Sequence, residues 1–241
     1  MSRLFATALM LATAAAPLHA RTLEFAGRTW HVRDAASGAP GPNAWSQDNA
    51  WVDESGRLHL RIDRVDGVWR CAEVVLDTPL GAGTYEFRVV GRVDQLDRNV
   101  VLGLFSYPDP SVGADFTHEI DIEFARWGDP AAPAGHWTVY PTTAALAPVT
   151  YAFDVALEGA YSTHRFHRGR DAVRFHMLHG HQDGDAQQAA SWTYAPRDAR
   201  RRISRAALPL HLNLWLFRGQ PPSDGQPVEV IVSDFRFTPA E

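Results

Sequence analysis

The sequence predicts an all-β fold, a jelly-roll β-sandwich built from two antiparallel sheets. Short segments rich in β-branched and aromatic residues follow one another along the chain, and Gly, Pro and Asp separate them, as at residues 53–56 and 169–171. Amphipathic helical periodicity is nearly absent. The chain has 241 residues and 45% hydrophobic content, which is enough for one sizeable core. Many short strands around one core are typical of a single sandwich domain.

The same signals predict the individual strands in chain order. We expect strands at residues 58–62, 84–90, 100–105, 119–124, 137–140, 164–167, 173–177, 208–217 and 228–237. A short helical turn is expected near residues 198–203.

The N-terminal segment has the pattern of a signal peptide. Arg3 precedes an apolar stretch at residues 4–11, and small residues then lead to Ala20, after which we expect cleavage. Residues 21–241 are predicted to form the single domain, and the protein is predicted to be secreted or periplasmic. No later segment approaches the ~20 apolar residues that a membrane span needs, so no membrane insertion is expected.

The charge balance and the single cysteine limit the possible partners. The chain carries 23 basic and 28 acidic residues, a formal net charge of −5, so no nucleic-acid partner is expected. Without residues 1–20 the formal charge is −6, because Arg3 is lost. Cys71 is the only cysteine, so no intramolecular disulfide is possible and stability must come from the core.

Two polar clusters have the composition of binding sites but are interpreted as solvated loops. The first combines histidines and aspartates in the pattern of a metal site, but they straddle a strand end and a turn, so no metal is predicted: His176, His179, His181, Asp183 and Asp185. The second is a basic patch that would suit acidic glycans or nucleic acid: Arg197, Arg200, Arg201, Arg202 and Arg205.

The predicted strand at residues 119–124 carries a row of acids. Side chains alternate between the two faces of a strand, so Glu119, Asp121 and Glu123 share one face. The residues between them are apolar and are expected to pack into the core. Taken alone, such a row is most often just a solvated face.

Three carboxylates on one face repel one another, so at least one pKa should be raised at neutral pH. Glycoside hydrolysis uses two such groups, a carboxylate that attacks or activates water and a protonated acid for the leaving oxygen. In a straight strand Glu119 and Glu123 lie ~13 Å apart, whereas a retaining mechanism needs ~5 to 5.5 Å between carboxyl groups. We therefore expect strand curvature and side-chain lean to close the gap.

The predicted strand at residues 208–217 has one leucine face and one mixed face. The mixed face carries His211, Asn213, Trp215 and Phe217. Indole rings stack on sugars and amides bind their hydroxyls, so we expect a polysaccharide cleft if both strands belong to one sheet.

The string at residues 119–124, Glu-Ile-Asp-Ile-Glu-Phe, resembles the signature of glycoside hydrolase family 16, in the spacing of bacterial lichenases. Residues 83–88, 213–215 and 233–237 resemble further strands of that family. The resemblance implies a concanavalin A-like jelly roll with a concave substrate face. It also implies endo-acting cleavage of a β-linked polysaccharide by double displacement, with retention of configuration. By position, Glu119 is the nucleophile, Glu123 the general acid/base, and Asp121 the residue that tunes them.

The resemblance also implies substrate-binding residues. Glu73, Asn213 and Trp215 match family positions that contact sugar. Val75 stands where lichenases usually have an arginine. Three further candidates follow the acid strand, in a region where lichenases have a glutamine and asparagine pattern: Trp127, His136 and Tyr140. This difference indicates a glycan other than the mixed-linkage glucan of lichenases.

Three hypotheses remain open at this point: a hydrolase, a transglycosylase on the same site, and a non-catalytic carbohydrate-binding module. All three imply a polysaccharide partner, and we expect a monomer. A structural calcium ion on the convex face is common in related enzymes, but no ligand set in the sequence predicts one, and no cofactor is expected.

Overall fold

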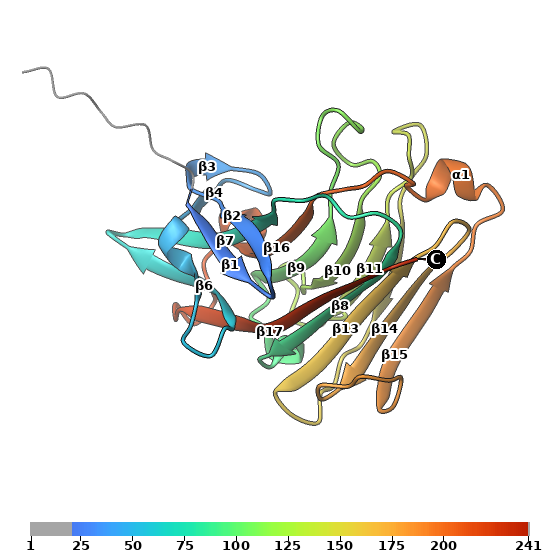
Figure 1. Cartoon of the computed structure of the whole chain (residues 1–241). Helices are drawn as coiled ribbons and strands as arrows, with labels where there is room; N and C mark the ends of the chain where they lie inside the picture. The colour runs from blue at the N-terminus through green and yellow to red at the C-terminus, as the bar shows by residue number, and fades with distance from the viewer. Residues whose placement is uncertain (1–20, 241) are drawn as a thin grey trace, which may run out of the picture.

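The computed structural model describes residues 21–240, so the predicted signal peptide lies outside the described residues. The chain forms two antiparallel sheets that pack face to face (Figure 1). The first sheet contains, from one edge to the other, β1 (Thr22–Phe25), β2 (Arg28–Val32), β7 (Val68–Leu76), β16 (Leu210–Leu216), β9 (Val100–Ser106), β10 (Ile120–Phe124), β11 (Gly135–Val139) and β12 (Val149–Phe153).

The second sheet covers the apolar side of the first. Its strands are, in order, β5 (Ala50–Val52), β6 (Leu58–Val65), β17 (Val228–Pro239), β8 (Gly83–Val90), β13 (Tyr161–Arg168), β14 (Val173–His179) and β15 (Gln188–Tyr194). β3 (Ala35–Gly38) pairs with β4 (Asn43–Trp45), and β4 in turn pairs with β7 and runs parallel to it. The short helices are η1 (Gln47–Asn49), η2 (Val93–Gln95), α1 (Ala199–Arg202) and η3 (Phe217–Gly219). The predicted jelly-roll sandwich is therefore confirmed.

The core lies between the two sheets and includes the apolar face of β10. Ile120, Ile122 and Phe124 are fully buried, as predicted. The facing side of β8 contributes Tyr85 and Phe87, which are also fully buried. Alternation on β10 therefore leaves its acids on the face away from the core.

The predicted strands match observed ones, with differences at the ends. β10 begins at Ile120, so Glu119 directly precedes the strand, and His118 before it has a left-handed φ of 63°. β16 ends at Leu216, because Phe217 opens η3. Eight strands in the described part of the chain were not predicted: β1, β2, β3, β4, β5, β7, β12 and β15. β7 is buried on both faces and therefore shows no clear alternation, and the side chains of β15 are half exposed or exposed. Within residues 21–240, no helix is both long and apolar enough to cross a membrane.

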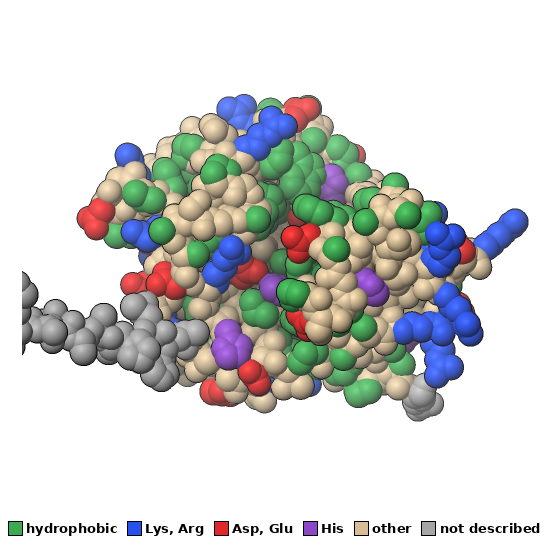
Figure 2. Space-filling model, turned by 90° about the horizontal axis from the view of Figure 1, so that it is seen from above, with side chains coloured by type: hydrophobic (Ala, Val, Ile, Leu, Met, Phe, Trp, Pro, Cys, Tyr) green, Lys and Arg blue, Asp and Glu red, His purple; other side chains and the backbone are tan. Residues whose placement is uncertain are grey.

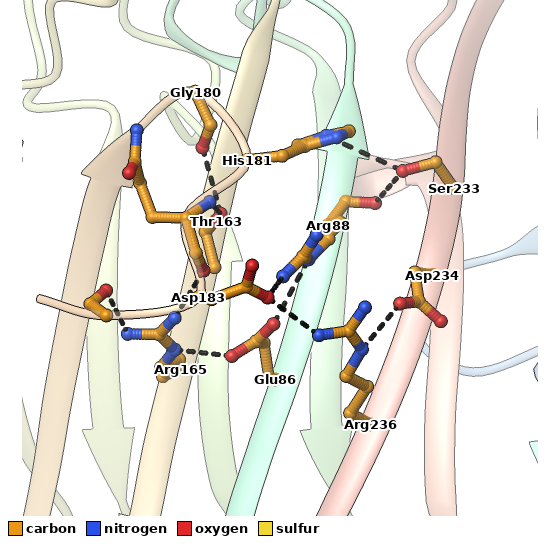
Figure 3. A network of polar contacts seen from close by, with 12 residues as sticks. Glu86, Arg88, Thr163, Arg165, Gly180, His181, Asp183, Ser233, Asp234 and Arg236 are labelled. Atoms are coloured by element: carbon orange, nitrogen blue, oxygen red, sulfur yellow. Dashed lines mark hydrogen bonds and ion pairs between the residues drawn. The ribbon is translucent and has the colours of Figure 1, made fainter.

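The loop at residues 180–187 folds over the outer face of the second sheet, where arginines hold it (Figure 3). Arg165 Nη1 donates to the Gly184 carbonyl at 2.8 Å and to Asp185 Oδ1 at 3.0 Å. Asp183 accepts hydrogen bonds from Arg88 and Arg236. Because the carboxylates of Asp183 and Asp185 already bind guanidinium groups, this part of the convex face does not fit a divalent cation. Residues 21–240 contain no group of three or more His, Cys, Asp or Glu side chains placed to hold a metal ion.

Candidate active site

The acids of β10 lie in the middle of the first sheet, on the face away from the core. β9 and β11 flank β10, and their register places Glu123 beside Gly103 on one side and His136 on the other. In the same way, Asp121 lies between Phe105 and Thr138. The site is therefore built on paired strands rather than on loops.

β16 and β7 extend this arrangement beyond β9. Asn213 pairs with Gly103 on one side and with Glu73 on the other. One row of positions therefore crosses five strands, from Glu73 through Asn213, Gly103 and Glu123 to His136. At ~4.8 Å between strands the row spans about 19 Å. Five of the predicted site residues thus share one face of one sheet: Glu73, Asp121, Glu123, His136 and Asn213.

These side chains are sheltered although they face away from the core. Glu73, Asp121, His136 and Asn213 are all less than a tenth exposed, while Glu119 and Glu123 are half-buried. Seen from above, the molecular surface is hollowed near its centre, and acidic and histidine side chains lie in that hollow (Figure 2). A carboxyl group that is shielded from water is poorly solvated, which disfavours its charged form and raises its pKa.

The three acids are held partly protonated near neutral pH. Burial raises the pKa of Glu119 to about 8 and that of Glu123 to about 7. Burial, together with the charges of Glu119 and Glu123, raises the pKa of Asp121 well above its ordinary value. The Glu119 and Asp121 carboxyl groups share a hydrogen bond that lowers the pKa of Glu119 and raises that of Asp121. The shared proton therefore belongs to Asp121, which donates it to Glu119.

Two tyrosines stand close to the acids. Burial and the charges of all three carboxylates raise the pKa of Tyr140, which places this predicted residue beside the acid row. Burial, a hydrogen bond to Asp115 and the charge of Glu119 raise the pKa of Tyr107. Both phenols therefore stay protonated. The Tyr107 hydroxyl already donates to Asp115, so Tyr140 is the one that offers a hydrogen-bond donor in the hollow.

Glu73 is anchored in a buried network at the far end of the row. Its Oε2 accepts a hydrogen bond from Arg33 Nη1 at 2.5 Å, and its Oε1 accepts one from His211 Nδ1 at 2.8 Å. Burial favours the neutral carboxyl, but the hydrogen bonds and charges of His211 and Arg33 together hold the pKa of Glu73 below its ordinary value. Glu73 is therefore a charged group whose two oxygens both have partners.

Trp127 and Trp215 form an aromatic wall at the Glu123 end of the acid row. Trp127 lies between Trp215, with ring centroids 6.3 Å apart, and Phe217, at 5.5 Å. Its indole nitrogen lies 3.0 Å from His136 Nε2. Trp127 also has a left-handed φ of 51°, a strained backbone conformation that concentrates at functional sites. The four predicted substrate-binding residues other than Glu73 and Tyr140 therefore gather around Glu123: Trp127, His136, Asn213 and Trp215.

Two buried acceptors in the site have no partner among the described residues. They are Oδ1 of Asp121 and Oδ1 of Asn213. Buried polar atoms normally have partners, so these two mark places where the described residues leave a hydrogen bond to be supplied by water or by a ligand hydroxyl group. An uncharged polyhydroxylated molecule supplies such donors.

Sequence reasoning missed three residues that build the site. Gly103 had a usable signal, because an isolated glycine inside a strand often marks a close approach of another group. His211 was placed on the polar face of its strand, but its bond to Glu73 depends on β7, which was not predicted. Arg33 showed no signal, since it reaches Glu73 from a distant part of the sequence.

Comparisons with known proteins give a clear answer at the level of the fold. No protein-family model matches the sequence, and no curated protein matches it. Among solved structures, a β-glucanase of Bacillus licheniformis is 19% identical over 88% of this chain and 92% of that chain, with a TM-score of 0.65.

Two further structures show the same architecture. An immunostimulatory antigen of Mycobacterium tuberculosis, described as a pseudo β-1,3-glucanase, is 20% identical over 88% of this chain and 91% of that one, with a TM-score of 0.66. A family 16 endo-glucanase of Bacteroides ovatus, in complex with G4G3G-2F-DNP, is 14% identical over 87% and 94% of the two chains, with a TM-score of 0.62. The protein therefore has the jelly-roll fold of these β-glucanases.

Proposed function

We propose that this protein is a retaining, endo-acting glycoside hydrolase of family 16 that cleaves a β-linked polysaccharide. The observation that carries the proposal is the row of Glu119, Asp121 and Glu123, which lies in a hollow, is partly protonated near neutral pH and contains one shared hydrogen bond. A solvated row of acids would lack the burial that raises these pKa values.

The proposed first step forms a covalent intermediate. A carboxylate oxygen of Glu119 attacks the anomeric carbon while Glu123 gives its proton to the glycosidic oxygen, so the bond to the leaving sugar breaks. In the second step, Glu123 removes a proton from water. The water oxygen attacks the same carbon and releases Glu119, and the original configuration is restored.

The mechanism needs Glu123 protonated and Glu119 ionised. The pKa of Glu123, about 7, keeps its proton in place below neutral pH. Burial raises the pKa of Glu119 to about 8, so the reactive form is the fraction of the protein in which Glu119 has lost its proton while Glu123 keeps its own. The hydrogen bond from Asp121 opposes the effect of burial and favours the Glu119 anion, which makes Asp121 the partner that tunes Glu119.

Substrate recognition is assigned to the residues around Glu123. Trp127 and Trp215 offer rings for stacking on sugars, Tyr140 offers a hydroxyl donor, and Asn213 offers an unpaired amide oxygen. Glu73 holds Arg33 and His211 at the end of the row. Because Trp127 and His136 depart from the lichenase pattern, the proposed substrate differs from mixed-linkage glucan.

Other features also support a glycan-active enzyme. The neighbours with this fold include a β-glucanase and an endo-glucanase with a bound glycoside. One neighbour is described as a pseudo β-1,3-glucanase, so the fold by itself does not separate a hydrolase from a non-catalytic binding protein. The presence of all three acids favours the hydrolase. The predicted signal peptide supports an activity outside the cytoplasm, in the periplasm or the medium.

Proton NMR of the first product tests the mechanism. With a polymer that the protein cleaves, we expect the new reducing end to appear as the β-anomer and to mutarotate afterwards. The α-anomer as first product would show inversion and overturn the assignment of Glu119 as nucleophile. Oligosaccharides longer than the starting material would instead indicate the transglycosylase, and binding without any cleavage the carbohydrate-binding module.

A further inference from the structure

A second hollow, which the proposed function does not use, lies beside α1. It has a volume of about 690 Å³ and is lined by five arginines: Arg170, Arg197, Arg200, Arg201 and Arg205. Arginine side chains gather at the same edge of the molecule in the view from above (Figure 2). The chain as a whole is acidic, so this hollow is a local concentration of positive charge.

Most of these guanidinium groups have no acidic partner. Two aspartates also line the hollow, but Asp198 is paired with Arg202 at 3.2 Å, and Asp171 reaches only Arg205, at 3.8 Å. Within residues 21–240, the other four arginines form no ion pair, and all five are exposed. Clustered like charges repel one another, and a bound anion would relieve that repulsion.

One backbone and one side-chain hydrogen bond connect the arginine hollow to the rim of the acidic hollow. The Arg201 carbonyl accepts a hydrogen bond from the Thr142 amide at 2.9 Å, two residues after Tyr140. Ser204 Oγ lies 2.9 Å from Nδ1 of His118, which directly precedes Glu119. The segment that carries the arginines is therefore attached directly to segments that hold the acid row.

We propose that the arginine hollow binds sulfate or carboxylate groups of an acidic polysaccharide outside the hydrolytic site. Guanidinium groups bind such planar or tetrahedral oxyanions through paired hydrogen bonds. The hollow holds several separate cations. A polymer with repeated negative charges can contact several of them at once, whereas one small anion cannot. A polysaccharide chain held there lies next to the rim of the acidic hollow.

The hollow suits a glycan better than nucleic acid or a membrane. Among residues 21–240, no aromatic residue lines it, whereas sites for single-stranded nucleic acid stack bases on aromatic rings. None of the exposed large apolar residues lines it either, so it lacks the apolar face with which peripheral proteins enter a lipid surface. A flexible acidic polysaccharide needs neither feature.

The test measures binding of dextran sulfate and of neutral dextran of the same length. All proteins carry Glu119→Gln, so that turnover does not interfere and failure here leaves the hydrolase proposal untouched. We expect dextran sulfate to bind in 50 mM salt and neutral dextran not to bind. Arg200→Gln combined with Arg201→Gln should weaken binding about tenfold, and 200 mM salt should weaken it further.

Matched variants separate a site from general attraction. Arg64→Gln combined with Arg174→Gln removes the same charge from exposed positions outside the hollow and should change binding less than twofold. A second pair within it, Arg170→Gln and Arg197→Gln, should reproduce the loss. Equal weakening by the control pair, or unchanged binding in both hollow pairs, would overturn the proposal. Equally tight, arginine-dependent binding of duplex DNA or anionic vesicles would overturn the assignment to a glycan.

Discussion

The amide of Asn213 lies over Gly103, in space that any side chain at position 103 would occupy. A Cβ atom built on Gly103 would collide with Oδ1 of Asn213 and would lie 3.3 Å from a ring carbon of Phe105. Gly103 is also the strand neighbour of Glu123. The absence of a side chain on β9 therefore lets the Asn213 amide approach the acid row.

Replacement of Gly103 by alanine should displace Asn213 without unfolding the sheet. We expect kcat/KM to fall about 10- to 100-fold, because misplacing a positioning group by about 1 Å has effects of that size. Gly159→Ala is the control, since a Cβ there meets nothing within 4 Å. Unchanged activity in Gly103→Ala would show that the position of Asn213 does not matter.

Two substitutions at Asp121 separate its hydrogen bond from its charge. Asparagine keeps a donor toward Glu119, so Asp121→Asn should lower kcat by about tenfold, whereas Asp121→Ala loses the donor and should lower it by about 100-fold or more. Steady-state kinetics on both variants checks the order. Equal losses would mean that the hydrogen bond to Glu119 contributes nothing.

The pH dependence of kcat/KM should be bell-shaped, with its maximum between pH 7 and 8. Glu119 attacks only while ionised and Glu123 acts as an acid only while protonated, and burial raises their pKa values to about 8 and about 7, so activity falls on both sides of that range. Glu123→Gln removes the group whose ionisation causes the alkaline fall. That variant should keep activity only toward aryl glycosides, whose leaving groups need no proton, and without the alkaline fall. The same alkaline fall in Glu123→Gln would assign it to another group.

Glu73 should stabilise the fold in a pH-dependent way. Its pKa is lowered in the folded protein, so its stabilisation is present above the unfolded value near 4.5 and is lost as pH falls through the folded pKa. Glu73→Gln should therefore lower the free energy of unfolding by about 2 kcal/mol at pH 7 and by less at pH 3.

Urea denaturation at both pH values measures this difference. Glu158→Gln, at an exposed loop position, should change the free energy of unfolding little at either pH. A loss in Glu73→Gln that does not depend on pH would mean that the ionised network with Arg33 and His211 contributes nothing.

The sequence predicted the structure best where the alternation within a single strand determines which side chains are buried and which face the site. Alternation on residues 119–124 placed three acids on one face and three apolar residues in the core, and the structure confirms that division. The same alternation brought Asn213 and Trp215 to the face that carries the acids. A period of two is a strong signal when one face of a strand is buried and the other polar.

Contacts and burial that depend on neighbouring strands could not be predicted from the sequence. β7 is buried on both faces, so its pattern does not alternate, and the bond between Glu73 and His211 was not foreseen. Glu119 was predicted to lie inside the strand at residues 119–124. The chain instead turns just before it, at His118, and burial raises its pKa to about 8. Such shielding comes from tertiary packing and leaves no mark in a local pattern.

Reducing-end release from polysaccharides tests the central claim most directly. The substrates are mixed-linkage β-glucan, laminarin, xyloglucan, agarose and carrageenan, and the proteins are the chain without residues 1–20, its Glu119→Gln variant and its Glu158→Gln variant. We expect release from at least one polymer, abolished in Glu119→Gln and retained in Glu158→Gln. Undiminished release by Glu119→Gln, or none from any polymer by the folded protein, would contradict the account.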